Sequence, residues 1–254
     1  MLDTKERTGT NLPQADIARL AAEVAATTRL LNWLGILDYS GHVSARLPGH
    51  DALLIQPHTD SRAELSPDRV LVVNFDGEVL QGAARPPSET AIHIEILKAR
   101  PDVQAVLHSH MKIAIAFTMM EGVKLLPMRA RAVRWASGIP THPDPSHIKL
   151  TAQAQALART LGPHHAALMR AHGIVLTAES VRALLIDAVH FEENAIALMQ
   201  VLQAGARPLP LTPAEMEQIN RHEERAHHIG KLWKYYVGKG IGEGVLPREW
   251  PLGV

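Results

Sequence analysis

Two histidines at the end of an apolar run are the first residues in this chain whose spacing suits metal binding. The run covers residues 103–107 and ends in His108-Ser109-His110. Its β-branched residues predict a strand, in which side chains two residues apart lie on the same face. His108 and His110 would therefore project together, and two imidazoles on one face are the start of a divalent-metal site.

Spacing alone leaves a second interpretation open. The chain contains 15 histidines in 254 residues, so about one His-x-His pattern is expected by chance. The alternative to a metal site is a strand end with two solvent-facing histidines. Further ligands elsewhere in the chain would favour the metal site.

Two other segments carry side chains that suit the same site. Residues 166–171 predict a strand that continues over residues 174–176, and Gly173 would bend it so that the imidazole of His172 turns toward a site. Glu89 begins a predicted helix over residues 89–99, where the helix dipole alone would explain a carboxylate. Three neutral imidazoles and a carboxylate suit Zn²⁺, Mn²⁺, Co²⁺ or Fe²⁺, and the ligand types do not decide among these ions.

Arginines gather in a loop-rich middle segment, residues 123–145. Arg129, Arg131 and Arg134 lie within six residues, before a Gly-Ile-Pro turn. Loop arginines are usually solvated, and exposed ion pairs are common. The alternative is an anionic ligand, because a guanidinium can pair with a carboxylate through two parallel hydrogen bonds.

Composition narrows the class of protein. The 26 basic and 26 acidic residues balance, so nothing points to nucleic acid or an anionic membrane as a partner. Cysteine is absent, so a metal must bind to His, Asp or Glu. The polar N-terminus lacks a signal-peptide core and no apolar run approaches membrane-spanning length, which predicts a cytoplasmic protein. The length suits one large domain or two small ones.

Helices and short strands alternate along the chain and must position these side chains. Apolar spacing predicts a first helix over residues 17–34, capped by Asn11 or the residues just after it and ended by Gly35. Strands are expected over residues 40–46 and 53–56, and a hairpin over residues 70–80 turns at Asp76-Gly77. Later helices are expected over residues 112–120, 147–161, 180–204 and 212–237, followed by a loosely ordered tail from Gly238.

Taken together, the motifs resemble the class II aldolase/adducin family over about residues 14–205. In chain order they are Gly41-His42-Val43-Ser44-Ala45-Arg46, Asp76-Gly77, Ser88-Glu89, Ala99-Arg100-Pro101-Asp102-Val103 before His108-Ser109-His110, and Ala171-His172-Gly173. The resemblance implies an α/β (α/β/α) fold, with a central, mainly antiparallel β-sheet covered by helices. It also implies a single domain over residues 1–254, with a C-terminal helix and tail from about residue 206.

The resemblance further assigns roles to the candidate residues. It implies that His108, His110 and His172 bind one divalent metal ion, and that Glu89 is an acid/base or a fourth ligand. It implies a homo-oligomer, commonly a tetramer, with the site at a subunit interface.

Departures from the family pattern bear on the substrate. His42 stands where the sugar-phosphate enzymes have a phosphate-binding Asn, His58-Thr59 replaces a Ser-Gly, and Ser88 keeps only one of two family hydroxyls. Near the arginines, the aldolases carry a proton-donating tyrosine that is missing here. Arginine suits carboxylates. We therefore expect substrate contacts from His42, Arg62, Ser88, Arg129 and Arg131.

These changes resemble the decarboxylase branch of the family, which acts on hydroxylated aromatic or pyridine dicarboxylates. We expect a lyase, a metal-dependent decarboxylase of an ortho-hydroxylated aromatic dicarboxylate such as a dihydroxyphthalate. The metal would stabilise the developing charge, and Glu89 would supply a proton once burial raises its pKa. The alternatives are an aldolase or epimerase acting on a sugar phosphate or small hydroxy-carbonyl compound, and a non-catalytic adducin-like interaction module.

Overall fold

A twisted eight-stranded sheet forms the centre of the computed structural model, which describes residues 12–222 and 224–254. The strand order is β4-β3-β2-β1-β5-β8-β7-β6. Every neighbouring pair is antiparallel except the parallel pair β6 and β7. The strands are β1 (His42–Arg46), β2 (Ala52–Ile55), β3 (Leu71–Asn74), β4 (Val79–Gln81), β5 (Ala105–Ser109), β6 (Thr141–His142), β7 (Ala166–Met169) and β8 (Gly173–Ala178).

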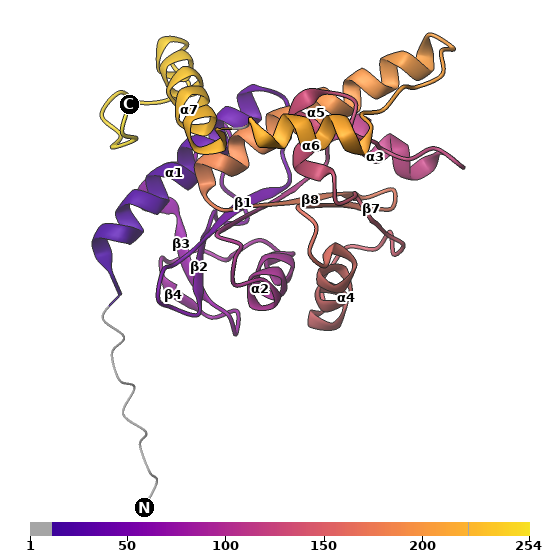
Figure 1. The fold of residues 1–254 in the computed structure, drawn as a ribbon. Helices are drawn as coiled ribbons and strands as arrows, with labels where there is room; N and C mark the ends of the chain where they lie inside the picture. Colours follow the sequence, from indigo (N-terminus) through magenta and orange to yellow (C-terminus); the bar gives the residue numbers. More distant parts are fainter. Residues whose placement is uncertain (1–11, 223) are drawn as a thin grey trace, which may run out of the picture.

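Helices cover both faces of this sheet, as Figure 1 shows. One face packs on α2 and α4, and the other packs on α1, α5 and α7, so two separate apolar clusters fill the interior. The predicted α/β/α architecture is therefore confirmed. The helices are α1 (Gln14–Trp33), α2 (Thr90–Ala99), α3 (Lys112–Ala116), α4 (Thr151–Leu161), α5 (Val181–Gln203), α6 (Pro213–Arg221) and α7 (Arg225–Gly242), with 3₁₀ turns η1 (Pro67–Arg69), η2 (Phe117–Met119) and η3 (Ala130–Trp135).

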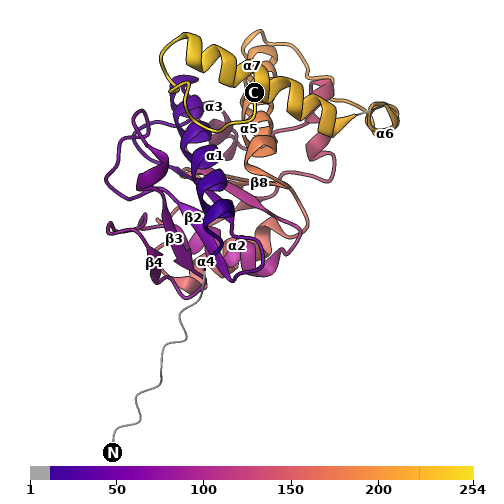
Figure 2. The same ribbon diagram turned by 90° about the vertical axis from the view of Figure 1, so that its left-hand side faces the viewer.

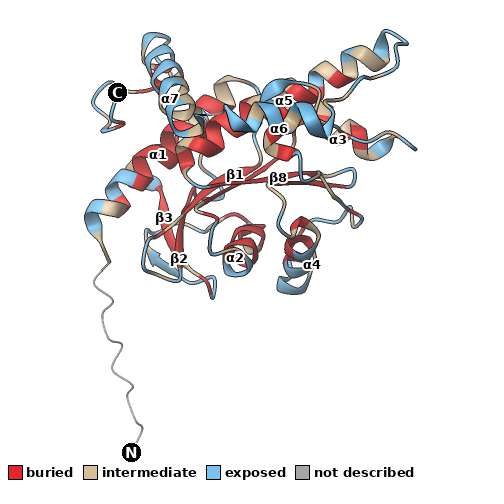
Figure 3. Cartoon of the chain, in the orientation of Figure 1, coloured by how far each residue is buried: buried red, intermediate tan, exposed pale blue. Residues whose placement is uncertain are grey.

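Strand β5 shows why its sequence is a continuous apolar run rather than an alternating one. Val106 packs in the cluster of α2 and α4, and Leu107 packs in the cluster of α1, α5 and α7. A strand buried on both faces needs apolar side chains at successive positions, and Figure 3 shows the central strands buried between the layers. Because side chains alternate, His108 follows Val106 onto the face of α2 and α4.

The segment expected to be one strand over residues 166–176 is instead a hairpin of β7 and β8. Met169 pairs with Gly173, and the backbone N–H of His172 donates to the carbonyl of Met169. Ala171 takes a left-handed conformation with φ of 51°, which few residues other than glycine adopt. Apolar runs on both sides of this turn hid it in the sequence, and the turn places His172 at the end of the sheet.

Two predicted helices are shorter than the sequence indicated. The helix expected over residues 147–161 begins at Thr151, because the side-chain oxygen of Gln153 accepts the backbone N–H groups of Lys149 and Leu150. The helix expected over residues 112–120 is α3, followed by the 3₁₀ turn η2. In contrast, α2 begins directly after Glu89, close to its predicted start.

The C-terminal segment differs most from expectation. The helix predicted over residues 212–237 is divided into α6 and α7, which point in different directions in Figure 2. The prediction of a loosely ordered tail from Gly238 is also wrong, since α7 continues to Gly242 and both Leu246 and Leu252 are buried. The buried indole of Trp233 donates to the carbonyl of Leu252 at 3.0 Å, because a buried Trp N–H needs an acceptor.

Asn11, proposed as a helix cap, lies outside the described residues. Among the helices that the structure does describe, none combines the length and the apolar character needed to cross a membrane.

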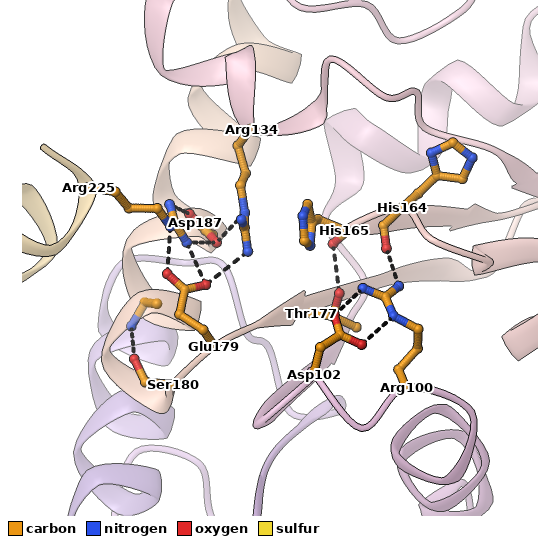
Figure 4. A network of polar contacts seen from close by, with 11 residues as sticks. Arg100, Asp102, Arg134, His164, His165, Thr177, Glu179, Ser180, Asp187 and Arg225 are labelled. Carbon is orange, nitrogen blue, oxygen red and sulfur yellow. Dashed lines mark hydrogen bonds and ion pairs between the residues drawn. The ribbon is translucent and has the colours of Figure 1, made fainter. Parts of the chain in front are cut away.

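A partly buried ion network joins α7 to the body of the molecule (Figure 4). The guanidinium of Arg225 donates to both carboxylate oxygens of Asp187, at 3.0 and 2.7 Å, and to Glu179 at 2.6 and 3.0 Å. Arg134 reaches the same two carboxylates. Burial raises the pKa of Asp187 although both arginines oppose the shift, so its ionised form depends on these partners.

Arg225→Ala should therefore destabilise the protein by about 2 to 3 kcal/mol, because Asp187 would keep one cation in place of two. Urea unfolding monitored by circular dichroism gives the free energy. Arg221→Ala is the matched control, since Arg221 pairs with Glu217 on the exposed side of α6 and should cost less than about 1 kcal/mol. Equal losses in the two variants would contradict the role assigned to the network.

Candidate metal centre

Three neighbouring strands bring the predicted ligands to one end of the sheet. His42 at the start of β1 pairs with His108 near the end of β5, and Ser109 pairs with Ile174 at the start of β8. The turn before β8 carries His172. Because antiparallel neighbours place the end of one strand beside the start of the next, residues far apart in sequence meet here.

Two glycines allow this close approach. A Cβ atom on Gly173 would lie 2.8 Å from Cε1 of His108 and 2.8 Å from the carbonyl oxygen of Ser109. Gly41 has φ of 80°, and a Cβ there would lie 2.7 Å from the carbonyl oxygen of His108. Gly173 therefore serves close packing against the histidines more than the bend that the sequence suggested.

The three imidazoles form a group that fits a metal ion. Ring nitrogens of His108, His110 and His172 all lie within 4.8 Å of one another. The Nε2 atom of each is buried and has no hydrogen-bond partner among the described residues, although buried polar atoms normally have one. Ring nitrogens that lie this close together, with Nε2 atoms that lack a hydrogen-bond partner, are what a divalent cation would satisfy.

The protonation of these rings also suits metal binding. Nδ1 of His108 lies 3.0 Å from the carbonyl oxygen of Ile174, so Nδ1 carries the hydrogen and Nε2 keeps its lone pair. Burial, together with His108, lowers the pKa of His172 to about 4. Burial also lowers the pKa of His110. Both rings are therefore neutral near pH 7, which is the form that binds a metal.

Glu89 completes the group from the start of α2. Its carboxylate oxygens lie 3.5 Å from Nε2 of His108 and 3.6 Å from Nε2 of His172, and the backbone N–H of Ile148 donates to it at 2.8 Å. Burial would raise the pKa of Glu89, but the contacts with His108, Ile148 and His172 outweigh it and lower the pKa to about 2. The expectation of a raised pKa is therefore wrong, and Glu89 is a carboxylate at neutral pH.

His147 lies beside this group and was missed by the sequence analysis. Its Nδ1 is 3.9 Å from the Glu89 carboxylate, and its ring centre is 5.1 Å from that of His172. Glu89, His147 and His172 form a second group of ligand atoms that lie within 4.8 Å of one another. His147 lies in an irregular loop before α4, where no periodicity could have indicated its direction.

His93 was also missed, although the sequence held a signal for it. It lies four residues after Glu89, so the two residues are about one turn apart at the start of α2. Its Nε2 is 2.7 Å from Nδ1 of His42, and its Nδ1 is 2.6 Å from Oγ of Ser44. Burial lowers the pKa of His93 to about 3 and that of His42 well below its usual range, so both rings are neutral.

The predicted substrate contacts are divided between the two faces of the sheet. His42 is buried with its ring centre 5.2 Å from that of His108, and Ser88 is exposed next to Glu89. Arg62 is buried but donates to the backbone carbonyls of Gly41, His58 and Asp60.

Arg129 and Arg131 lie in the other helical layer. Arg129 pairs with Glu193 of α5 at 3.2 Å. Arg131 lines a cavity of about 220 Å³ with Arg134 and Asp187. Within one chain, neither arginine joins the histidine group.

Comparison with known proteins identifies the architecture of this site. The profile of the class II aldolase and adducin N-terminal domain matches residues 22–199. The chain belongs to the class II aldolase and adducin family. Enzymes of this family depend on a divalent metal, and the histidine group with Glu89 provides ligands that fit one.

Relatives within the family have different activities. A 3,4-dihydroxyphthalate decarboxylase from Rhodococcus jostii (strain RHA1) is 27% identical over 240 residues, which cover 89% of this chain and 98% of that protein. A 5-methylthioribulose-1-phosphate/5-deoxyribulose-1-phosphate aldolase from Rhodospirillum rubrum is 30% identical over 188 residues, covering 71% of this chain and 79% of that protein. An aldolase II superfamily protein from Pseudomonas syringae shares the fold, with a TM-score of 0.79 at 20% identity over 91% of this chain and 95% of its own.

His108→Ala and His172→Ala should each abolish tight metal binding while the fold persists, because each removes one of three converging ligands. The metal content of the purified variants, measured by elemental mass spectrometry, tests the loss of metal. Circular dichroism spectra of the same variants test whether the fold persists. His227→Ala, an exposed histidine of α7, is the control and should retain full metal. Full occupancy in either ligand variant would exclude the assigned site.

His147→Ala should keep the metal stoichiometry but weaken metal affinity by about tenfold. This is the effect expected of a residue that contacts metal-binding side chains without binding the metal itself. Competition with a chromophoric chelator gives the affinity. Complete loss of the metal would instead make His147 a ligand, and an affinity equal to that of His227→Ala would remove it from the site.

Proposed function

We propose that this protein is a divalent-metal-dependent decarboxylase of an ortho-hydroxylated aromatic dicarboxylate of the dihydroxyphthalate class. The observation that carries the proposal is the group of three unpaired Nε2 atoms of His108, His110 and His172 beside the ionised Glu89. The decarboxylase from Rhodococcus jostii supports the substrate class, because its similarity extends over nearly the whole of both chains.

Bound at the three histidines, Zn²⁺ or Mn²⁺, or else Co²⁺ or Fe²⁺, would act as a Lewis acid that stabilises negative charge on a substrate oxygen. Decarboxylation breaks the bond between the ring carbon and the carboxylate, and the electron pair stays on the ring as CO₂ leaves. The ring carbon must then take up a proton.

Glu89 is the group of this chain that suits the proton transfers. Because its pKa is about 2, it begins as a base and can accept the hydrogen of the substrate hydroxyl. The same carboxyl group then returns that proton to the ring carbon. The N–H of Ile148 holds one oxygen of the carboxylate in place, so the group does not depend on solvent for its orientation.

Substrate recognition is proposed for both sets of residues identified in the sequence. His42 and Ser88 lie beside the centre, and Arg62 supports the loop that carries His42 through its bonds to Gly41. Arg129 and Arg131 lie in the opposite layer of the same chain, so they would reach a substrate carboxylate only in a neighbouring subunit. A homotetramer with the site at a subunit interface is the assembly we propose, in a cytoplasmic protein whose residues 1–254 form one domain.

An aldolase or epimerase acting on a sugar phosphate is the second candidate. The relative from Rhodospirillum rubrum is named for aldol cleavage of sugar phosphates, and the same centre would stabilise the charge that such cleavage leaves. Two residues favour the first candidate, because each replaces a phosphate-binding group of the sugar-phosphate enzymes. His42 stands in place of their amide side chain, and Pro87 stands in place of a hydroxyl. A binding module without catalysis would have no use for three buried, unpaired imidazole nitrogens.

The decisive assay compares hydroxylated aromatic dicarboxylates with sugar phosphates on the metal-loaded protein. We expect CO₂ from at least one dihydroxyphthalate and no triose or glycolaldehyde product. His108→Ala should release at least 100-fold less CO₂, because the substrate oxygen would lose the charge stabilisation that the metal provides, worth on the order of 10²-fold. Aldol cleavage without CO₂ from any dicarboxylate would establish the second candidate instead.

A further inference from the structure

Three buried side chains form a hydrogen-bonded row that ends beside the metal centre. Ser44 of β1 contacts Nδ1 of His93 at 2.6 Å, and Nε2 of His93 contacts Nδ1 of His42 at 2.7 Å. Ser44 and His93 are fully buried, and His42 is 4% exposed. His42 in turn lies opposite His108 on the neighbouring strand.

The buried hydroxyl of Ser44 sets the direction of the hydrogen bonds in this row. Among the described side chains, Nδ1 of His93 is the acceptor within reach of that hydroxyl hydrogen. If Ser44 donates to Nδ1, His93 must carry its hydrogen on Nε2 and donate it to Nδ1 of His42. The opposite direction would leave the buried Ser44 hydrogen without a side-chain acceptor, which is unfavourable for a buried polar group.

This direction also fixes the chemistry of His42. Its Nδ1 accepts, so the hydrogen of the neutral ring lies on Nε2, the nitrogen that His93 does not use. A neutral imidazole held in this way is a hydrogen-bond donor that does not need to change protonation. Such a fixed donor stabilises an oxygen as negative charge develops on it, without the cost of reorganising water.

We propose that Ser44 and His93 are positioning residues that hold His42 in its Nε2–H tautomer, so that His42 donates a hydrogen bond to the anionic oxygen of the substrate. The identity of that oxygen, a carboxylate or an ionised hydroxyl, rests on the proposed decarboxylase function. The tautomer itself does not depend on that function, because it follows from contacts within this chain.

Histidine nitrogen chemical shifts test the tautomer directly. In the Zn²⁺-loaded protein labelled with ¹⁵N-histidine, His42, identified by its absence from His42→Gln spectra, should show an unprotonated Nδ1 and a protonated Nε2. Ser44→Ala should move both signals toward a mixture of tautomers. A His42 with its hydrogen on Nδ1 in the unaltered protein would overturn the proposal, whatever the enzyme's substrate is.

A double-mutant cycle then separates positioning from simple structural support. Ser44→Ala should lower kcat for the dihydroxyphthalate by about tenfold at unchanged metal content, whereas in the His42→Gln background it should lower kcat by less than about twofold, because an amide donor does not depend on the row. Thr177→Val, which removes a buried hydroxyl from β8, is the control and should leave kcat unchanged.

The outcomes are distinguishable. Equal losses from Ser44→Ala in both backgrounds would show that Ser44 only supports the structure, and would overturn the proposal. A protein that releases no CO₂ from any dicarboxylate would instead contradict the proposed function, while the nitrogen shifts would still decide the tautomer of His42.

Discussion

The hydrogen bond from Nδ1 of His108 to the carbonyl of Ile174 connects the fold to the chemistry of this protein. It joins β5 to β8 at the point where the sheet ends. Because a carbonyl oxygen only accepts, this bond fixes a ring hydrogen on Nδ1 of His108. Nε2 has no hydrogen-bond partner among the described residues and lies 3.5 Å from the Glu89 carboxylate. Gly173 is part of the same constraint, because any side chain there would separate the two strands.

Electrostatics in the site follow from that arrangement. Buried imidazoles resist protonation, so His110 and His172 stay neutral near pH 7 and the ionised Glu89 is the charge they surround. The Glu89 carboxylate therefore lies beside a polar but uncharged His172 ring. A divalent cation would complement this negative charge.

The sequence predicted the parts of the site that strand periodicity or helix starts could reveal. Spacing within one strand pointed to His108 and His110, whereas the helix dipole alone could explain Glu89 at a helix start, so its role came from the family resemblance. The family resemblance brought His172 to them, and the fold class it implied is confirmed. His147 could not be found, because an irregular loop gives no direction to a side chain. The hairpin at Ala171 and the packed tail after Gly238 were missed because long-range contacts, including that of Trp233 with Leu252, decide them.

Helix α2 carries both Glu89 at its start and His93 one turn later. Within the same layer, α2 packs against α4, and buried residues such as Ile96 and Leu157 belong to their common apolar cluster. Glu89, the proposed acid/base, and His93, the proposed support of His42, therefore move together, because they lie one turn apart at the start of one helix. Repacking the contact between α2 and α4 would shift both residues relative to the histidines of the sheet, so the packing within this helical layer offers evolution a way to adjust the site without replacing any residue in it.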